Sequence, residues 1–258
     1  MDWREGEGTR WLETALPGAR AVFSTRLGGV SEGPWSSLNL GILTGDERDR
    51  VVANRVRLCA ATGIDPGGVV IGRQVHASAI ASHEQAQEPS LWPDPAADPP
   101  ELDGHVIDRS GLAALVFVAD CLPIALAGPD GLAMLHCGWR GLAAGIIGRG
   151  ALAVEATSAA IGPGIGPCCF EVGPEVLEEF ADLGDGIAEG RMLDLPEVAR
   201  RLLARAGVEQ VESAGLCTFC EADLFFSHRR DKGVTGRMGN LAWIDAPDHG
   251  STPDQGST

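Results

Sequence analysis

Short apolar runs separated by turn residues make up the middle of the chain. The runs at 112–119 and 122–127 are each long enough for a buried strand, and a third follows at 132–136. The sequence GPDG at 128–131 joins the last two and has the composition of a tight turn. Shorter apolar runs predict further strands at 21–25, 69–76, 159–161, 208–211 and 224–227.

Helical patterns lie between these runs. Apolar positions recur on one face of 46–62, which predicts an amphipathic helix. A second helix is expected over 141–157, while Pro174 and Pro196 each begin a helical pattern, because proline favours the first turn of a helix. Alternating strands and helices predict a mixed α/β or α+β fold, which we expect to form a single domain over 1–244.

Two segments offer little to bury. Residues 88–100 hold five prolines and several acids, so we expect a surface loop there. Residues 245–258 consist mainly of Asp, Pro, Gly, Ser and Thr. This composition predicts a disordered C-terminal tail.

Charge and composition narrow the function classes. The 258 residues carry 20 Lys and Arg against 36 Asp and Glu, a formal charge of −16 that disfavours a nucleic-acid-binding surface. No apolar stretch is long enough for a membrane span, and the acidic residues at 1–8 do not resemble a secretory signal. We therefore expect a cytoplasmic protein whose seven cysteines are reduced and available for metal binding or catalysis.

Three potential metal ligands stand at the ends of predicted strands. Cys121 follows one apolar run, His136 ends another, and His76 ends a third. Because adjacent strands bring such ends together, one thiolate and two imidazoles would form a three-ligand zinc site with an open fourth position, which is typical of a catalytic site. Packing is the alternative, since cysteine is often buried as a small apolar residue. Asp120 and Arg140 favour the metal site, because packing alone does not require charge beside these positions.

A second cysteine pattern is less informative. Cys217 and Cys220 form a CxxC motif, but a structural zinc site needs a second spaced pair. Cys168 and Cys169 are contiguous, and we do not expect them to complete such a site. Packing is the prediction for this motif.

Positive charge is dense only at 227–237, where arginines would suit a phosphate because the planar guanidinium donates two parallel hydrogen bonds. A solvated surface is the alternative for any single arginine. The glycine-rich loop at 162–167 offers backbone N–H groups to an anion. It lacks the Lys-Ser/Thr ending of a P-loop, so no nucleoside triphosphate site is predicted.

An ordered set of motifs connects these features. The set comprises FSTRLGGVSEGPWSSLNLG at 23–41, D and NR within 46–55, QVH at 74–76, ADCLP at 119–123, HCGWRG at 136–141, GPGIGPCCFEVG at 162–173 and SHRRDKGVTGRM at 227–238. Together these motifs resemble the laccase-domain family, first named for multicopper polyphenol oxidases and later understood as zinc-dependent purine nucleoside phosphorylases. The resemblance extends over about 22–238, nearly the whole predicted fold.

The resemblance implies a single-domain, layered α/β/β/α sandwich with mixed sheets. It implies a zinc ion held by His76, Cys121 and His136, with copper as a possible substitute. It further implies phosphorolysis of adenosine, inosine, guanosine and S-methyl-5'-thioadenosine to the base and the sugar 1-phosphate, with adenosine deamination as a side activity. A monomer or weak homodimer is expected.

Four further residues match family positions expected to contact the nucleoside or phosphate. These residues are Asn39, Arg55, Arg140 and Arg229. The chain also departs from the family pattern: Cys137 stands where alanine is usual, which places a second thiol beside His136, and His228 replaces a frequent tyrosine.

Laccase chemistry itself is excluded by counting ligands. Several copper centres require many histidines and paired H-x-H motifs, whereas this chain has six histidines and no such pair. Two other classes stay open. In a cysteine-dependent hydrolase or deamidase, Cys121 is the nucleophile and His136 or His76 its base. In a metal-binding partner protein there is zinc but no turnover, and the dense arginines argue against this class.

Overall fold

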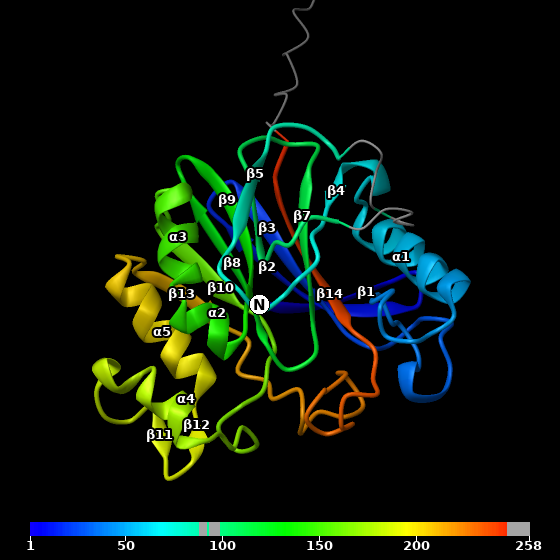
Figure 1. Cartoon of the computed structure of the whole chain (residues 1–258). Helices are drawn as coiled ribbons and strands as arrows, with labels where there is room; N and C mark the ends of the chain where they lie inside the picture. The colour runs from blue at the N-terminus through cyan, green and yellow to red at the C-terminus, as the bar shows by residue number, and fades with distance from the viewer. Residues whose placement is uncertain (88–91, 93–98, 247–258) are drawn as a thin grey trace, which may run out of the picture.

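The structure, a computed structural model, describes residues 1–87, 92 and 99–246. Within these residues two six-stranded mixed sheets face each other (Figure 1). The first sheet contains, in spatial order, β1 (Asp2–Gly6), β2 (Thr9–Leu16), β3 (Ala19–Ser24), β14 (Met238–Ile244), β7 (Ala113–Val118) and β4 (Val69–Val70). The second contains β13 (Gln210–Ser213), β10 (Ser158–Ile161), β8 (Leu122–Gly128), β9 (Gly131–Cys137), β6 (Gly104–Ile107) and β5 (Ile80–His83).

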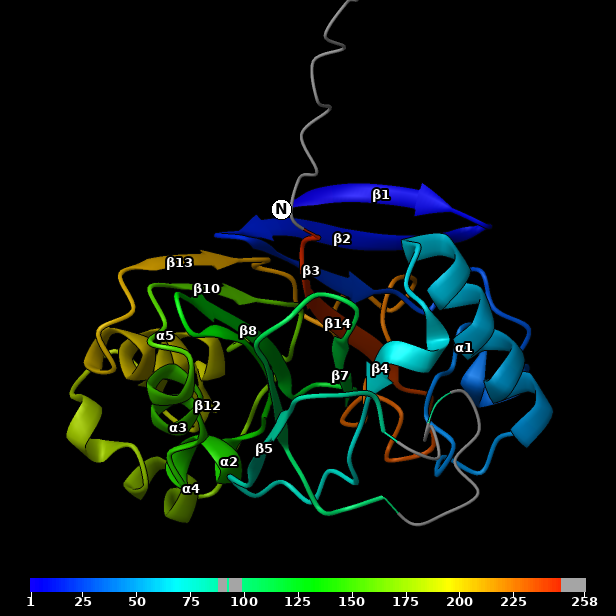
Figure 2. The ribbon, with the colours of Figure 1, turned by 90° about the horizontal axis from the view of Figure 1, so that it is seen from above.

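Helices cover the outer side of each sheet. Viewed from above, α1 lies beside the first sheet and the other helices lie beside the second (Figure 2). The helices are α1 (Arg48–Thr62), α2 (Trp139–Ala143), α3 (Ile146–Ala153), α4 (Pro174–Glu178) and α5 (Leu195–Arg205), and a small hairpin joins β11 (Ala188–Glu189) to β12 (Met192–Leu193). The predicted α/β/β/α sandwich with mixed sheets is therefore confirmed.

The strand sequences explain the layers. In β7, Leu115 packs with α1, whereas Ala114 and Val116 point into the layer between the sheets. In β9, Leu135 packs against the helices of the second sheet, and Met134 points into the middle layer. Both faces of these strands are buried, so the strands form continuous apolar runs instead of alternating with polar residues.

Three sequence predictions about local structure are wrong. The run at 69–76 forms a strand only at Val69–Val70, because the chain then leaves the sheet edge. The run at 224–227 is irregular, and the helix expected over 141–157 is divided between α2 and α3. Gly145, with a φ of 82°, separates those two helices in the left-handed conformation that glycine readily adopts.

Several strands were not predicted. The outer hairpin of β1 and β2 carries charged side chains that mask its pattern, and β5 and β6 have only four residues each. The most consequential is β14, which pairs with both β3 and β7 at the centre of its sheet. Gly239 and Asn240 interrupt its apolar pattern, although both are buried there.

Two predicted irregular segments are described only in part. Of the loop at 88–100, Trp92 is fully buried beside Phe117, so this residue does not lie on the surface. Of the tail at 245–258, Asp245 is paired with Arg20. The other calls on 88–91, 93–98 and 247–258 fall outside the described residues. No helix in the described part of the chain is long and apolar enough to cross a membrane.

Candidate functional site: a His-Cys-His cluster in an arginine-lined cavity

His136 lies near the end of β9, and its side chain points toward the layer between the sheets. Its Nδ1 lies 2.7 Å from Oδ1 of Asp103, a fully buried carboxylate at the start of the neighbouring β6. The backbone N–H of His136 also donates to the carbonyl of Asp103 at 2.7 Å. Since the carboxylate takes Nδ1–H, the Nε2 atom of His136 is left to bind a ligand.

The same carboxylate organises the loop that carries His76. Asp103 accepts hydrogen bonds from three consecutive backbone N–H groups, those of Val75 at 3.1 Å, His76 at 3.0 Å and Ala77 at 2.8 Å. His76 has a φ of 62°, unusual for a residue with a side chain, and these bonds stabilise it. His76 is therefore presented by an irregular loop and not, as predicted, by a strand end.

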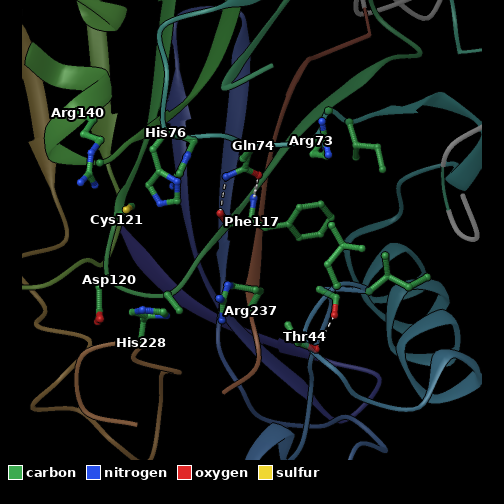
Figure 3. Close-up of a pocket in the computed structure, with 18 of the residues that line it drawn as sticks. Thr44, Arg73, Gln74, His76, Phe117, Asp120, Cys121, Arg140, His228 and Arg237 are labelled. Atoms are coloured by element: carbon green, nitrogen blue, oxygen red, sulfur yellow. Dashed lines mark hydrogen bonds between the residues drawn. The ribbon is translucent and has the colours of Figure 1, made fainter. Parts of the chain in front are cut away.

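Cys121 lies where the chain crosses from the first sheet to the second. It follows Asp120, which has a φ of 92°, and directly precedes β8. β8 pairs with β9 so that Pro123 stands opposite His136, which brings Cys121 beside the histidine. The potential ligand atoms of His76, Cys121 and His136 lie within 4.8 Å of one another (Figure 3).

The electrostatics of the cluster favour a thiolate. Burial opposes ionisation of Cys121, but the charges and hydrogen bonds of His136 and His76 outweigh burial and lower its pKa. Burial likewise opposes protonation of His136, whereas Cys121 and Asp103 raise its pKa. The hydrogen bonds from His136 and from the backbone also outweigh the effect of burial on Asp103 and lower its pKa. A thiolate and a carboxylate thus flank His136, an arrangement that suits a cation.

Gly138 leaves the space that the cluster needs. A Cβ atom at this position would lie 2.9 Å from Sγ of Cys121 and 3.2 Å from Cδ2 of His76. The first distance is shorter than any normal contact, so a side chain here would displace the cysteine. The first glycine of the HCGWRG motif, Gly138, is therefore needed for the close packing of the cluster.

Cys137 does not join the cluster. Its side chain belongs to the opposite face of β9, in the core beneath the helices, and is fully buried. Burial raises the pKa of its thiol well above the usual value. The departure from alanine at this position therefore leaves the ligand set of His76, Cys121 and His136 unchanged.

The cluster opens into a cavity of about 660 Å³, a size typical of small-molecule sites. Cationic, aromatic and polar side chains line the cavity (Figure 3). They include Thr44, Arg48, Arg55, Arg73, Gln74, Phe117, Asp120, Arg140, Phe170, His228, Arg229 and Arg237. The cavity therefore combines a potential metal-binding cluster with a surface suited to an anion.

Three of the four expected contact residues line the cavity, and two of these, Arg140 and Arg229, are exposed. Arg140 belongs to α2, is exposed, and lies with its guanidinium 4.3 Å from the centre of the Trp139 ring. Arg229 lies over the ring of Phe170 at 5.2 Å and donates to the carbonyl of Glu171 at 2.8 Å. Both side chains are positioned to meet a ligand in the cavity.

The other two expected residues are buried. Arg55 is only 1% exposed, lies against the rings of Trp92 and Phe117, and donates through Nε to the carbonyl of Leu40. It thus supports the aromatic wall of the cavity. Asn39 is fully buried; its Oδ1 accepts the N–H of Arg237 at 2.9 Å, and its amide donates to the loop at 41–46. Asn39 has no exposed atom with which to touch a ligand.

Sequence reasoning missed several residues of the cavity. Gln74 donates to the carbonyl of Phe117 at 2.7 Å and accepts its N–H at 2.7 Å, so a side chain takes the place of the expected strand pairing (Figure 3). Arg237 was not missed, since it belongs to the arginine-rich segment at 227–237 that was predicted to suit a phosphate. Its side chain points into the cavity, and burial lowers its pKa. Asp103 was also missed, because it contacts mainly backbone atoms and leaves no pattern in the sequence.

The expectation that Cys168 and Cys169 would not complete a site with the CxxC motif is wrong, whereas Cys217 and Phe219 do pack against the core as predicted. Cys217 and Cys220 lie beside Cys168 and Cys169, with all four sulfur atoms within 4.8 Å of one another. The contiguous pair does complete the set, because a turn between the two residues places both sulfurs on the same side.

The chain is similar to known proteins over nearly its whole length. A family model described as multi-copper polyphenol oxidoreductase laccase matches residues 20–245. Purine nucleoside phosphorylase YlmD of Geobacillus stearothermophilus is 37% identical over 262 residues, which cover 92% of this chain and 95% of the relative. Purine nucleoside phosphorylase YfiH of Escherichia coli is 38% identical over 241 residues, which cover 88% and 94%.

Solved structures agree with the fold. The crystal structure of YlmD from Geobacillus stearothermophilus matches with a TM-score of 0.87 at 34% identity, covering 94% of this chain and 98% of that chain. The crystal structure of the Bacillus licheniformis hypothetical protein YfiH matches with a TM-score of 0.82 at 31% identity, covering 94% and 99%. The layered architecture is thus shared with both proteins.

Proposed function

Because the chain belongs to the multi-copper polyphenol oxidoreductase laccase family, we propose its function from the members that it resembles. Two similar proteins are named purine nucleoside phosphorylases. We propose that this chain is a zinc-dependent purine nucleoside phosphorylase. The proposed substrates are adenosine, inosine, guanosine and S-methyl-5'-thioadenosine, cleaved with phosphate to the base and the sugar 1-phosphate. Adenosine deamination is proposed as a second activity, and a cytoplasmic monomer or weak homodimer as the working form. The proposal rests chiefly on one observation: a single cavity holds both the His-Cys-His cluster and the arginines.

The donor set fits a zinc ion. One thiolate and two imidazoles form a soft to borderline ligand set, and the contact of His136 with Asp103 is the carboxylate–histidine arrangement found around zinc. Zinc is preferred to copper because three converging ligands offer the tetrahedral geometry that zinc favours, and copper remains a substitute. A bound zinc ion would act as a Lewis acid on a polar group of the substrate.

The arginines would bind phosphate. Arg140 has no hydrogen bond or ion pair to another described side chain, so its guanidinium is available to a dianion entering the cavity. Arg229 and Arg237 also line the cavity and add positive charge to it. Holding phosphate against the sugar converts a bimolecular attack into an oriented one within the complex.

Phe117 and Asp120 would hold the nucleoside. Phe117 is partly exposed to the cavity and is fixed by Gln74, so its ring offers an apolar face for the purine. As the glycosidic bond breaks, positive charge develops on the sugar. The carboxylate of Asp120, held by Thr218 and by the N–H of Arg229, lies on the cavity wall where it would stabilise that charge.

A chromatographic assay of purified protein with adenosine, with and without phosphate, tests the proposal. We expect adenine and ribose 1-phosphate to appear only with phosphate, and Cys121→Ala to abolish the reaction even with added zinc. Adenine and free ribose without phosphate would identify a hydrolase, and full activity of Cys121→Ala would refute the proposed role of the cluster.

A cysteine-dependent hydrolase is the second candidate, because His136 lowers the pKa of the Cys121 thiol. The two candidates respond differently to reagents. A chelator inactivates the phosphorylase, and zinc restores it. A cysteine hydrolase tolerates the chelator and is inactivated by a thiol-alkylating reagent.

A further inference from the structure

A second group of potential metal ligands lies outside the His-Cys-His cluster. Cys168 and Cys169 occupy the turn after the glycine-rich loop, and Cys217 and Cys220 come from a segment about fifty residues further along the chain. Their sulfur atoms all lie within 4.8 Å of one another. None of the cavity-lining residues belongs to this group, so it is not an extension of the proposed active site.

The distances between sulfurs distinguish a metal site from a disulfide. Sγ of Cys220 lies 3.5 Å from Sγ of Cys168 and 3.5 Å from Sγ of Cys169, and all four thiols are free. A disulfide requires a separation of about 2.05 Å. Four zinc–sulfur bonds of about 2.3 Å in a tetrahedron place the sulfurs about 3.8 Å apart, close to the spacing observed.

Backbone hydrogen bonds prepare the cluster for thiolates. The N–H of Gly166 donates to Sγ of Cys217 at 3.2 Å, and the N–H groups of Phe219 and Cys220 also donate to this sulfur. N–H donors stabilise a sulfur anion but add little to a neutral thiol. Gly166 approaches closely enough that a Cβ atom there would lie 3.5 Å from Sγ of Cys168.

The surroundings suit a structural ion. Cys168 and Cys220 are exposed, while Cys169 and Cys217 are partly buried against the core beneath α5, so an ion can enter from solvent and bind at the surface. Four protein sulfurs leave no open position for water or substrate, which distinguishes structural zinc sites from catalytic ones. A tetrahedral set of four sulfurs is typical of zinc.

We propose that Cys168, Cys169, Cys217 and Cys220 bind a structural zinc ion that fastens the loop at 162–170, whose Ile165 and Phe170 line the cavity, to the loop at 214–220. The backbone already joins these loops: the N–H of Thr218 donates to the carbonyl of Gly164 at 3.0 Å. Coordination bonds from the ion to cysteines of both loops would join them again at their outer edge.

The connection reaches the active cavity through Thr218, which lies within the CxxC motif. Its hydroxyl donates to Oδ1 of Asp120 at 2.7 Å, and Asp120 directly precedes Cys121. On the other loop, the N–H of Ile165 donates to the carbonyl of Asp120 at 2.8 Å. Both fastened loops therefore hold Asp120, the residue that directly precedes the proposed metal ligand Cys121.

Zinc content of the full-length protein tests the site independently of activity. We expect about two zinc ions per chain in the wild type and about one in Cys168→Ser/Cys220→Ser. Cys59→Ser, at a buried thiol outside both clusters, is the matched control and should retain about two. A wild type that holds no more zinc than Cys168→Ser/Cys220→Ser overturns the proposal.

A cobalt titration keeps the proposal testable if the serine variant does not fold. In Cys121→Ala/His136→Ala the cysteine cluster is intact, and no thiol remains in the active cluster. We expect added Co²⁺ to give one equivalent of intense tetrahedral ligand-field absorption with thiolate-to-cobalt charge transfer. Absence of both bands refutes the site. Since neither readout uses catalysis, the site is judged separately from the proposed phosphorylase activity.

Discussion

Replacing Asp103 by asparagine tests whether a single buried carboxylate assembles the active cluster. The carboxylate receives one hydrogen bond from His136 and three from the backbone of the His76 loop. Asparagine keeps one oxygen acceptor but presents an N–H₂ donor in place of the other. That donor faces either the N–H groups of Val75 and Ala77 or the N–H groups of His76 and His136, so two hydrogen bonds are replaced by donor–donor contacts.

The magnitude follows from the number of bonds lost. A hydrogen bond to a charged group contributes about 1.5–3 kcal/mol, and loss of a carboxylate behind a metal-binding histidine typically weakens metal binding by about 10–100-fold. We therefore expect the zinc dissociation constant of Asp103→Asn to rise by about 10–100-fold, which corresponds to about 1.4–2.8 kcal/mol. His76 should also become more mobile, because its left-handed conformation depends on the same carboxylate.

Zinc affinity is measured by competition with a chromophoric chelator, and phosphorolysis is assayed at saturating zinc. Asp108→Asn is the matched control, because Asp108 is exposed at the other end of β6 and, among the described residues, forms its ion pair with the neighbouring Arg109. Circular dichroism of both variants establishes that each is folded. A zinc dissociation constant of Asp103→Asn within twofold of the wild-type value would contradict the proposed role of the carboxylate.

Three further predictions concern pH, space and charge. Burial, followed by the neighbouring His83, lowers the pKa of His105 to about 3 against the opposing effect of Asp103, so below about pH 6.5 the unfolded chain takes up a proton that the folded chain does not. We therefore expect that lowering the pH from 7 to 5 destabilises the wild type by about 2 kcal/mol more than His105→Leu, as measured by denaturant unfolding. An equal loss of stability in both proteins would exclude His105 as a source of the pH dependence. Gly138→Ala should fold but lose zinc, because the added Cβ displaces Cys121 by more than the roughly 0.2 Å that metal–ligand distances tolerate. An unchanged zinc content would show that the cluster does not need the space beside Gly138. Arg140→Ala should raise the KM for phosphate about 10–100-fold, whereas the exposed Arg149→Ala on the adjacent helix should not, and equal values for the two variants would remove Arg140 from the phosphate site.

The sequence predicts the Cys121–His136 pair well, because the two residues flank a hairpin. β8 and β9 are joined by a tight turn, and a hairpin turn fixes the register of both strands, so their outer ends must meet. The continuous apolar runs likewise indicate strands buried on both faces. These features depend on contacts between residues close in the chain, and such contacts leave a periodic or compositional pattern.

His76 shows where such reasoning stops. Its apolar neighbours predict a strand end, yet Gln74 pairs with the backbone of Phe117 through its side chain and the chain turns away from the sheet. No local pattern distinguishes a glutamine that replaces a strand partner from one that faces solvent. The four-cysteine cluster was missed for a related reason, since its halves are about fifty residues apart and are brought together by pairing between distant segments, such as β10 with β13 and Gly164 with Cys217.

Two buried aspartates explain why the site depends on residues that are not ligands. His76 and Asp120 both have positive φ values, and the backbone N–H groups of residues 75–77 are satisfied by a side chain instead of a strand partner. Asp103 accepts those of the His76 loop, while Asp120 accepts the N–H of Arg229 and the hydroxyl of Thr218. A carboxylate suits this role because it offers two acceptor oxygens, and its negative charge strengthens each hydrogen bond that it accepts. Each aspartate also lies next to a proposed metal ligand, so we expect the negative charge that accepts these hydrogen bonds to favour a cation at the cluster as well.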